Sequence, residues 1–396
     1  MEVEMGETTK PELGKIGVIN PFALAEIKLG RRVEWDRIAN HQAFLAHVLD
    51  FPYDKLFDPQ YGSPLYAGYR FDPVKKVLVR DPVLADIPTL FRKLSLPDQA
   101  ALTAGALGGN GGGPPTQQWI AGGNFFTDPA QFDDPVQGAL PDCHFISALA
   151  SLAWANPYAI CQRTRQTSSN DSFGQGGAVD MIQFFGGPGA VPANVEVTEL
   201  LPLLEPGNLY QYACSSDVGE TWPAIYEKAW VKWFTGDAGD QPDYTKVEGG
   251  DPVADLVSLT GLNPTYKSTQ GQTANQIWND VRSNCRGSWT FNPMVAVTYQ
   301  SAAAAPISID YATAGLVAWH VYSILGWIFD GNLEYIVLRN PWGNTPATLN
   351  IDKGPWTPIE QIASGLTFSL NLPAGGVFAL RSDTFQQYFE SYGWVS

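Results

Sequence analysis

Residues 141–157 read PDCHFISALASLAWANP, and this run says more about the fold than any other part of the chain. Pro141 and Asp142 are typical of a helix start, and Asn156 with Pro157 is typical of a helix end. The apolar residues between them cover nearly every face of the expected helix. A helix that is apolar all round is normally buried, so we expect this one to lie in the middle of a domain.

The pattern of apolar residues changes along the rest of the chain. Helical spacing continues in TWPAIYEKAWVKWF (221–234) and TANQIWNDVRSN (273–284). From Asn292 onward, β-branched and aromatic runs alternate with Gly, Pro, Asn and Asp, which is typical of an antiparallel sheet. Helices followed by strands favour the α+β class, with an active site in the cleft between the two halves.

A glycine-rich run, GALGGNGGGPP at 105–115, is typical of a flexible linker. It separates an N-terminal region, 1–104, from the rest of the chain. We expect that region to be mainly helical, because HQAFLAHVLDF (41–51) and DPVLADIPTLFRKL (81–94) have apolar residues at helical spacing. The remaining chain divides into a helical half and an antiparallel sheet half, 116–290 and 291–396.

Composition and charge restrict the possible partners. The chain has 396 residues, of which 44% are hydrophobic, and a net charge of -16. Such an acidic globular protein repels phosphate backbones and anionic lipids, so we expect neither nucleic acid nor a membrane as partner. The start, MEVEMGETTKPELG, lacks the basic and apolar regions of a signal peptide, which favours a cytoplasmic location. Nothing in the sequence indicates the oligomeric state.

The cysteines and histidines do not have the spacing of a metal site. The four cysteines form no CxxC pair, and the four histidines form no HExxH motif. We therefore expect reduced thiols and no zinc. The cysteines are Cys143, Cys161, Cys214 and Cys285.

Cys143 lies in the first turn of the expected buried helix, where free backbone N–H groups and the helix dipole favour a thiolate. Cysteines in such positions can have a pKa lowered to about 3.5 to 7.5 and act as nucleophiles. A small buried apolar residue is the other interpretation, and position alone leaves both open. Six residues earlier, the Gln137 amide could serve an oxyanion hole with the Cys143 N–H, although a surface glutamine is the commoner case.

His320 is the best candidate for a general base, and the reasoning is by elimination. It lies in the apolar run LVAWHVYSILGW, where a histidine needs a hydrogen-bond partner. His144 follows Cys143 directly, and its side chain points about 100° away around the helix. His41 and His47 precede the linker. A hydrogen-bonded core histidine remains the alternative.

Asn340 ends the strand after His320, and the hairpin between them decides which way it faces. The turn sequence is Asp-Gly-Asn at 330–332. A three-residue loop there puts Asn340 beside His320 on one face of the sheet, through two pairings, Phe329 with Leu333 and Tyr322 with Asn340. A two-residue loop puts them on opposite faces unless a bulge compensates, so a Cys–His–Asn site predicts the longer loop.

Several of these segments resemble motifs of the calpain family of cysteine peptidases. QGALPDCHFISALASLAW resembles the family's cysteine motif, close to QGxLGDCWFLAAxASL. AWHVYSILGW and VLRNPWGN resemble its histidine and asparagine motifs, close to GHAYSV and LRNPWG. VEVTELLPL, TWPAIYEKAWVKWFTG and GVFALRSDTFQQYF are similar to further family segments, so the resemblance covers roughly 116–396.

The resemblance implies a papain-like calpain catalytic core that acts as a cysteine endopeptidase on proteins or peptides through a thioester acyl-enzyme. It implies roles for five residues: Gln137 as oxyanion donor, Cys143 as nucleophile, His320 as base, Asn340 as orienting residue and Trp342 as a shield over the His–Asn contact. This chemistry requires no cofactor.

Three positions depart from the family motifs. Pro141 and His144 replace the motif's Gly and Trp, and Trp319 replaces the Gly before His320. We expect His144 and Trp319 to shape the walls of the substrate site rather than to change the catalytic residues.

The resemblance also raises calcium dependence, although the chain has no DxDxDG loop. The acidic loop GDAGDQPD (236–243) is a candidate, with a solvated loop as the commoner explanation. Two other functions remain open, a papain-fold transpeptidase or ligase and a non-catalytic binding module. The N-terminal region is interpreted as a propeptide of a zymogen whose linker the enzyme cuts, a recognition module, or a stabilising extension.

Overall fold

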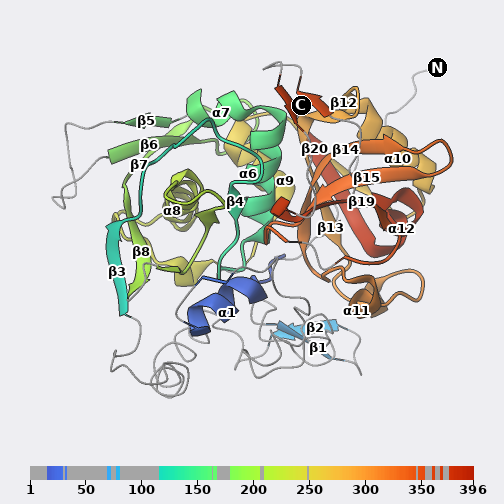
Figure 1. Cartoon of the computed structure of the whole chain (residues 1–396), viewed down its shortest axis with the longest axis horizontal. Coiled ribbons are helices and arrows are strands. Elements are labelled where there is room, and N and C mark those ends of the chain that lie inside the picture. Colours follow the sequence, from blue (N-terminus) through green and yellow to red (C-terminus); the bar gives the residue numbers. More distant parts are fainter. Residues whose placement is uncertain are drawn as a thin grey trace.

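The computed structural model describes most of the chain after residue 115 and short parts before it. The described residues are 16–29, 32–33, 69–72, 77–80, 116–162, 164–166, 179–205, 209–247, 249–344, 347–352, 359–361, 366–368 and 374–396. Figure 1 shows helix α6 (Cys143–Ala155) between a helix-containing half and a large sheet. All 13 residues of α6 are buried, so the predicted central helix is confirmed.

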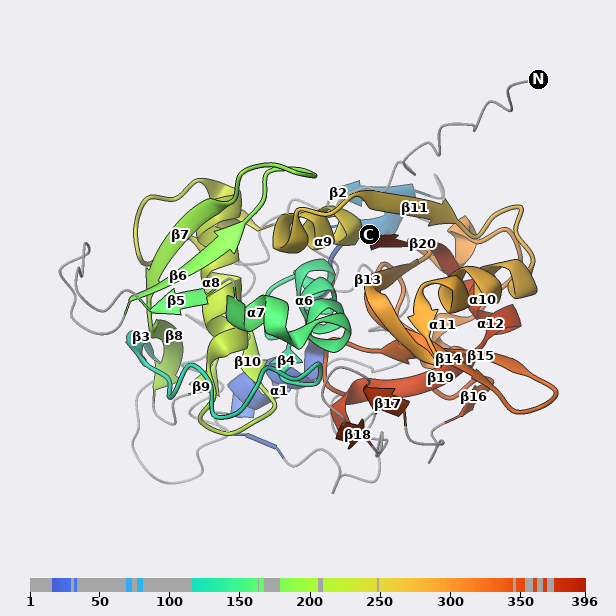
Figure 2. The same ribbon diagram turned by 90° about the horizontal axis from the view of Figure 1, so that it is seen from above.

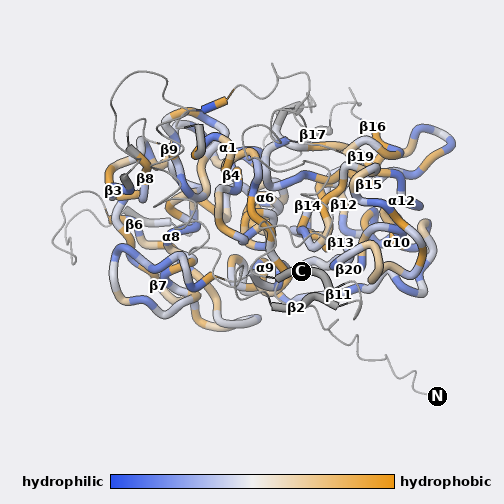
Figure 3. Tube along the Cα trace, turned by 90° about the horizontal axis from the view of Figure 1, so that it is seen from below, coloured by the Kyte–Doolittle hydropathy of each residue, from blue (hydrophilic) through white to orange (hydrophobic). Residues whose placement is uncertain are grey.

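Serine side chains join α6 to the sheet. Ser151 Oγ donates to Met294 O (2.8 Å) in β13 (Trp289–Thr298). Ser147 Oγ donates to Val321 O (3.0 Å) in β14 (Val321–Phe329). An unsatisfied buried hydroxyl costs about 1–3 kcal/mol, so these bonds let polar residues occupy an otherwise apolar helix. Figure 3 shows hydrophobic colours gathered around α6.

The half that contains α6 also contains antiparallel sheets, in addition to the helices that the sequence predicted. Its strand orders are β3-β8-β9, β5-β6-β7 and β10-β4. The strands are β3 (Thr116–Ala121), β4 (Pro135–Val136), β5 (Thr164–Gln166), β6 (Val179–Phe184), β7 (Ala193–Thr198), β8 (Leu200–Glu205), β9 (Leu209–Tyr210) and β10 (Cys214–Ser215). The helices are α7 (Pro157–Gln162), α8 (Trp222–Thr235) and α9 (Pro252–Thr260), with the 3-10 helix η3 (Tyr244–Lys246). Val195 and Val197 in β7 are two residues apart and both buried, as expected for residues on one face of a strand.

The other half is built on one antiparallel sheet (Figure 2), as the sequence predicted. Its order is β11-β20-β13-β14-β15-β19-β16, with β12 paired to β13. Its remaining strands are β11 (Pro264–Ser268), β12 (Cys285–Arg286), β15 (Glu334–Arg339), β16 (Ile351–Asp352), β19 (Val377–Arg381) and β20 (Phe389–Val395). β17 (Ile359–Gln361) and β18 (Leu366–Phe368) pair with each other in a separate two-stranded sheet. The helical elements are α10 (Ala274–Ser283), α11 (Tyr311–Ala314), α12 (Ser382–Tyr388), η4 (Ala302–Ala304) and η5 (Ala374–Gly376).

The β14–β15 hairpin has a different turn from the one expected. Phe329 pairs with Glu334 rather than with Leu333, so the predicted three-residue loop is wrong. The physical reason is an Asp330 side chain whose Oδ1 accepts the backbone N–H groups of Asn332 (2.8 Å) and Leu333 (2.7 Å), which closes a tighter turn.

A β-bulge in β14 then restores the orientation that the site needs. The register shifts between Ile324 and Gly326, so Leu325 is the extra residue. Beyond it Ser323 pairs with Arg339, and the ladder continues toward Tyr322 opposite Asn340. The Leu325 carbonyl accepts Trp154 Nε1 (2.7 Å) and Thr290 Oγ1 (3.2 Å), which fixes the bulge against α6 and β13.

The N-terminal region contributes α1 (Pro21–Leu29) and a hairpin of β1 (Tyr69–Asp72) and β2 (Val77–Arg80). The helices predicted at 41–51 and 81–94 and the linker at 105–115 lie outside the described residues. In the part of the chain that the structure describes, no helix has the length and apolar character needed to span a membrane.

Candidate active site

Cys143 is the first residue of α6, as predicted, but its thiol is fully buried. Burial raises the pKa of the Cys143 thiol to about 12, while backbone hydrogen bonds from Val18 and Val321 lower it. The expected thiolate is therefore not the favoured form in this structure, because desolvation outweighs the helix N-terminus. The contact with Val321 also brings the sulfur to the residue that follows His320.

His320 and Asn340 form the pair that the sequence predicted. His320 Nε2 lies 2.9 Å from Asn340 Oδ1. The backbone N–H of Trp342 donates to the same Oδ1 (3.2 Å), which identifies that atom as the amide oxygen. Nε2 therefore carries the proton, and Nδ1, which has no partner among the described residues, presents a lone pair. Burial lowers the pKa of His320 to about 3, so the ring is neutral.

The two tryptophans beside this pair differ in what they do. The Trp342 ring lies 4.8 Å from the His320 ring and is buried, a position suited to shielding the His320–Asn340 bond. Trp319 is also buried and has a backbone φ of 54°, in the left-handed region that glycine adopts without cost. The calpain motif has glycine here, so this chain accepts strain of about 1–2 kcal/mol to place a tryptophan.

Gln137 is fully buried, in contrast to the surface glutamine of the alternative interpretation. Its Nε2 donates to Val18 O (2.5 Å) and Leu140 O (2.6 Å), and its backbone N–H donates to Pro341 O (2.9 Å). The last bond ties Gln137 to the loop that carries Asn340. The sequence contained no sign that Val18, more than a hundred residues away, would contact this amide.

His144 points away from the site, as its helical position predicted. Its Nδ1 lies 2.5 Å from Asp255 Oδ2 in α9, and its ring packs edge-on against Trp230. A Cβ on Gly250 would come within 2.5 Å of His144 Cε1, so the ring lies directly behind Gly250. His144 thus supports the Gly250 backbone.

Acidic residues that the sequence did not single out meet near β4 and β10. Ligand atoms of Asp134, Asp217 and Glu220 all lie within 4.8 Å of one another. Burial, helped by the charges of Glu220 and Asp133, raises the pKa of Asp134 to about 7, although hydrogen bonds from Gln131 and Trp222 oppose the shift. An all-oxygen set with a desolvated carboxylate suits a hard cation such as calcium. Because Asp134 is far from Asp217 and Glu220 in the sequence, no short motif reveals this set.

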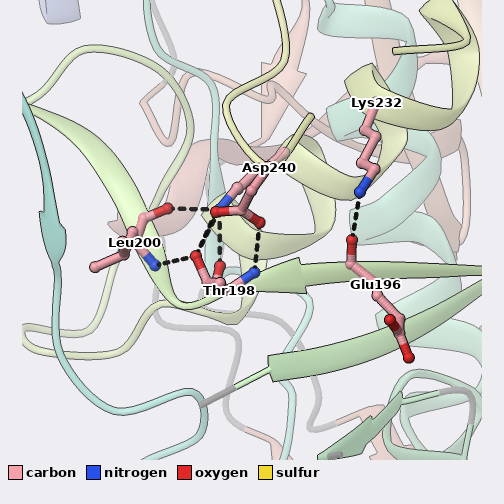
Figure 4. Close-up of polar contacts among 6 residues, drawn as sticks. Glu196, Thr198, Leu200, Lys232 and Asp240 are labelled. Atoms are coloured by element: carbon pink, nitrogen blue, oxygen red, sulfur yellow. Dashed lines mark hydrogen bonds and ion pairs between the residues drawn. The ribbon is translucent and has the colours of Figure 1, made fainter. Parts of the chain in front are cut away.

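The acidic loop at 236–243 is engaged by protein donors instead. Asp240 forms a buried ion pair with Lys228 (3.0 Å) and accepts the backbone N–H of Thr198 (2.7 Å). Figure 4 shows Asp240 directed at Thr198, beside the separate bond from Lys232 Nζ to the Glu196 carbonyl. These contacts satisfy Asp240 without a cation.

A cysteine at the N-terminus of a central helix, joined through the adjacent strand to a buried His–Asn pair, defines a protein of the cysteine peptidase class. A family model described as calpain family cysteine protease matches residues 115–392. The chain therefore belongs to the calpain family.

Curated relatives agree with this assignment. A thiol protease of Porphyromonas gingivalis (strain ATCC BAA-308 / W83) is 26% identical over 274 residues, which cover 65% of this chain and 53% of the relative. Calpain clp-4 of Caenorhabditis elegans is 29% identical over 268 residues, with 65% and 34% covered. Calpain-type cysteine protease DEK1 of Arabidopsis thaliana is 25% identical over 241 residues, with 59% and 10% covered. The chain thus spans about half, or less, of the length of these relatives.

Proposed function

We propose that this chain is a cysteine endopeptidase that hydrolyses peptide bonds in proteins or peptides through a thioester acyl-enzyme. The observation that supports this most is the 2.9 Å contact between His320 Nε2 and Asn340 Oδ1, with Nδ1 left to accept a proton. The four cysteines are free thiols, as this chemistry requires of the nucleophile.

The proposed reaction uses the residues as follows. Cys143 transfers its proton to His320 Nδ1 while its sulfur attacks the peptide carbonyl carbon. The Gln137 amide and the Cys143 backbone N–H stabilise the resulting oxyanion. The C–N bond then breaks as His320 returns the proton to the leaving amine, and a water attacks the thioester to release the acid and restore the thiol. Asn340 holds the imidazole in the required tautomer.

We place Gln137 and Cys143 in the first half of the catalytic region and His320 and Asn340 in the second, with 1–104 as a regulatory region and 105–115 as a linker. The boundary expected at 290–291 lies earlier, before β11, because β11 pairs with β20 in the sheet of the second half. No cofactor takes part in the reaction. Calcium, bound by Asp134, Asp217 and Glu220, would neutralise buried negative charge at the edge of the first half and so stabilise it.

A peptide-library cleavage assay with Cys143→Ala tests the peptidase proposal. We expect cleavage by the wild type to be lost in Cys143→Ala and retained in Cys161→Ala, which removes a cysteine from α7. Product masses measured with an added amine separate hydrolysis, which leaves a free acid, from ligation, which leaves a new amide. Cleavage that survives in Cys143→Ala would contradict the proposal.

A further inference from the structure

A segment of the N-terminal region, Ile16–Asn20, lies against the candidate active site. All five of its residues are buried. It contacts residues that precede the nucleophile, Gln137, Gly138 and Pro141, and the Gly249–Gly250 backbone. The segment is more than 115 residues away from these elements in sequence, so its position is a tertiary contact and not a consequence of chain connection.

The first part of the segment binds like a peptide strand. Ile16 and Gly250 form an antiparallel bridge in which each backbone N–H donates to the other's carbonyl, at 3.1 and 3.0 Å. Gly17 then passes so close to the Pro141 carbonyl that a Cβ on it would lie 2.1 Å from the oxygen. A bridge of this kind recognises any extended backbone, whereas the contact at Pro141 accepts glycine alone.

The middle of the segment contacts two of the proposed catalytic residues, Cys143 and Gln137. The Val18 backbone hydrogen bond lowers the pKa of the Cys143 thiol, as only a donated N–H does, so the sulfur lies beside the Gly17–Val18 amide. The Val18 carbonyl accepts Gln137 Nε2 at 2.5 Å. The nucleophile and the proposed oxyanion donor are thus both occupied by residues of the same chain.

The end of the segment is anchored beside Gln137, and the helix that follows it reaches the tryptophan that covers His320. Asn20 Nδ2 donates to the Gln137 carbonyl (2.7 Å), and the Asn20 backbone N–H donates to the Gly138 carbonyl (3.2 Å). Asn20 Oδ1 accepts the N–H of Phe22 (3.0 Å), which caps the start of α1. The Phe22 ring packs edge-on against Trp342, whose ring also covers His320.

We infer that residues 16–20 are an intramolecular inhibitor that occupies the peptide-binding site of this chain. The inference rests on the proposed peptidase function for the meaning of the site, but the occupancy itself is independent of activity.

The register of the segment separates an inhibitor from a substrate. Hydrolysis requires the sulfur and the oxyanion donors at one and the same carbonyl. The sulfur lies beside the Gly17–Val18 bond, whereas Gln137 Nε2 holds the carbonyl of Val18, one residue further along. Gln137 Nε2 donates to the carbonyls of Val18 and Leu140 and not to that of Gly17, so we expect the segment to remain uncut.

The same contacts describe the peptide that would bind here as an inhibitor. The Gly250 bridge and the Gln137 bond involve only backbone atoms of Ile16 and Val18, so among these contacts only the close approach of Gly17 to Pro141 selects a residue type.

The test is the rate at which iodoacetamide alkylates Cys143 in the full chain, followed by peptide mass mapping. Gly17→Val cannot keep its place at Pro141, so we expect its Cys143 to be alkylated about tenfold faster or more than in the wild type. Gly186→Val is the matched control, because Gly186 is exposed and a Cβ there meets nothing within 4 Å. Asn20→Ala, which removes the anchor without adding bulk, should also accelerate alkylation.

Adding the peptide Ile-Gly-Val-Ile-Asn to Gly17→Val should slow alkylation again, whereas Ile-Val-Val-Ile-Asn should not. Equal rates in the wild type and both folded variants would overturn the inference. Purified wild type that begins at Val18 would overturn it too, since the segment would then be a substrate. Fast alkylation of Gly17→Val without peptide hydrolysis would uphold occupancy and reject the peptidase proposal, so the two failures are distinguishable.

Discussion

At the scale of single residues, His320 shows how burial and one hydrogen bond decide the state of a catalytic group. Desolvation lowers its pKa to about 3, and the Asn340 amide only partly opposes this. In the unfolded chain the imidazole titrates near its usual pKa of about 6.5. As pH falls below about 6.5, the unfolded chain binds a proton that the folded chain does not, so stability is lost.

We therefore predict that the free energy of unfolding falls between pH 6.5 and pH 4, and falls less steeply in His320→Gln, which cannot titrate. Urea denaturation at several pH values measures both slopes. His47→Gln, from the N-terminal region, is the control for removing an imidazole. Parallel slopes for His320→Gln and the wild type would show that His320 is not buried in neutral form.

Trp319 offers a second test at this scale. At its φ of 54° a glycine should make the protein more stable than an alanine does, which is the reverse of the usual order. Both Trp319→Ala and Trp319→Gly lose the buried ring, which costs about 3–5 kcal/mol. Only glycine also relieves the left-handed backbone, so we predict Trp319→Gly to be about 1 kcal/mol more stable than Trp319→Ala. At Trp233, inside α8, the order should be the opposite. Urea denaturation of the four variants measures these differences in the free energy of unfolding.

At the scale of elements, the sequence could predict the helix of Cys143, because its caps and apolar faces are local. It could not predict the β14–β15 register, because two non-local facts set it: the Asp330 side chain tightens the turn, and the Leu325 bulge corrects the resulting slip. The final orientation of Asn340 agrees with the expectation only because these two departures cancel.

The hydrogen bonds that hold the bulge should therefore contribute to the stability of the hairpin. Trp154→Phe keeps an aromatic ring but removes the Nε1 donor to the buried Leu325 carbonyl (2.7 Å), and we predict a loss of about 1 kcal/mol. Trp327→Phe is the matched control, since its bond to Gly287 O is exposed to water, which can replace it. The two unfolding free energies compare directly in urea, and equal losses would mean that the bulge carbonyl is not held by Trp154.

At the scale of the whole molecule, the sequence could not predict the contacts between segments that are far apart in the chain. The motifs identify Cys143, His320 and Asn340, because each lies in a short recognisable run. They do not show that residues 16–20 contact Gln137 and Pro141 beside Cys143, nor that burial raises the pKa of the thiol. The acidic set of Asp134, Asp217 and Glu220 is of the same kind, because only folding brings its members together.

That acidic set leads to a prediction about calcium. Binding to the folded chain alone raises the unfolding temperature, so we predict stabilisation in calcium relative to chelator. Because the pKa of Asp134 is raised to about 7, protons compete with calcium below that pH, and the stabilisation should be larger at pH 8 than at pH 6. Asp134→Asn should abolish the effect, whereas Asp237→Asn, in the loop at 236–243, should retain it. Melting curves that are identical in calcium and chelator at pH 8 would exclude a calcium site here.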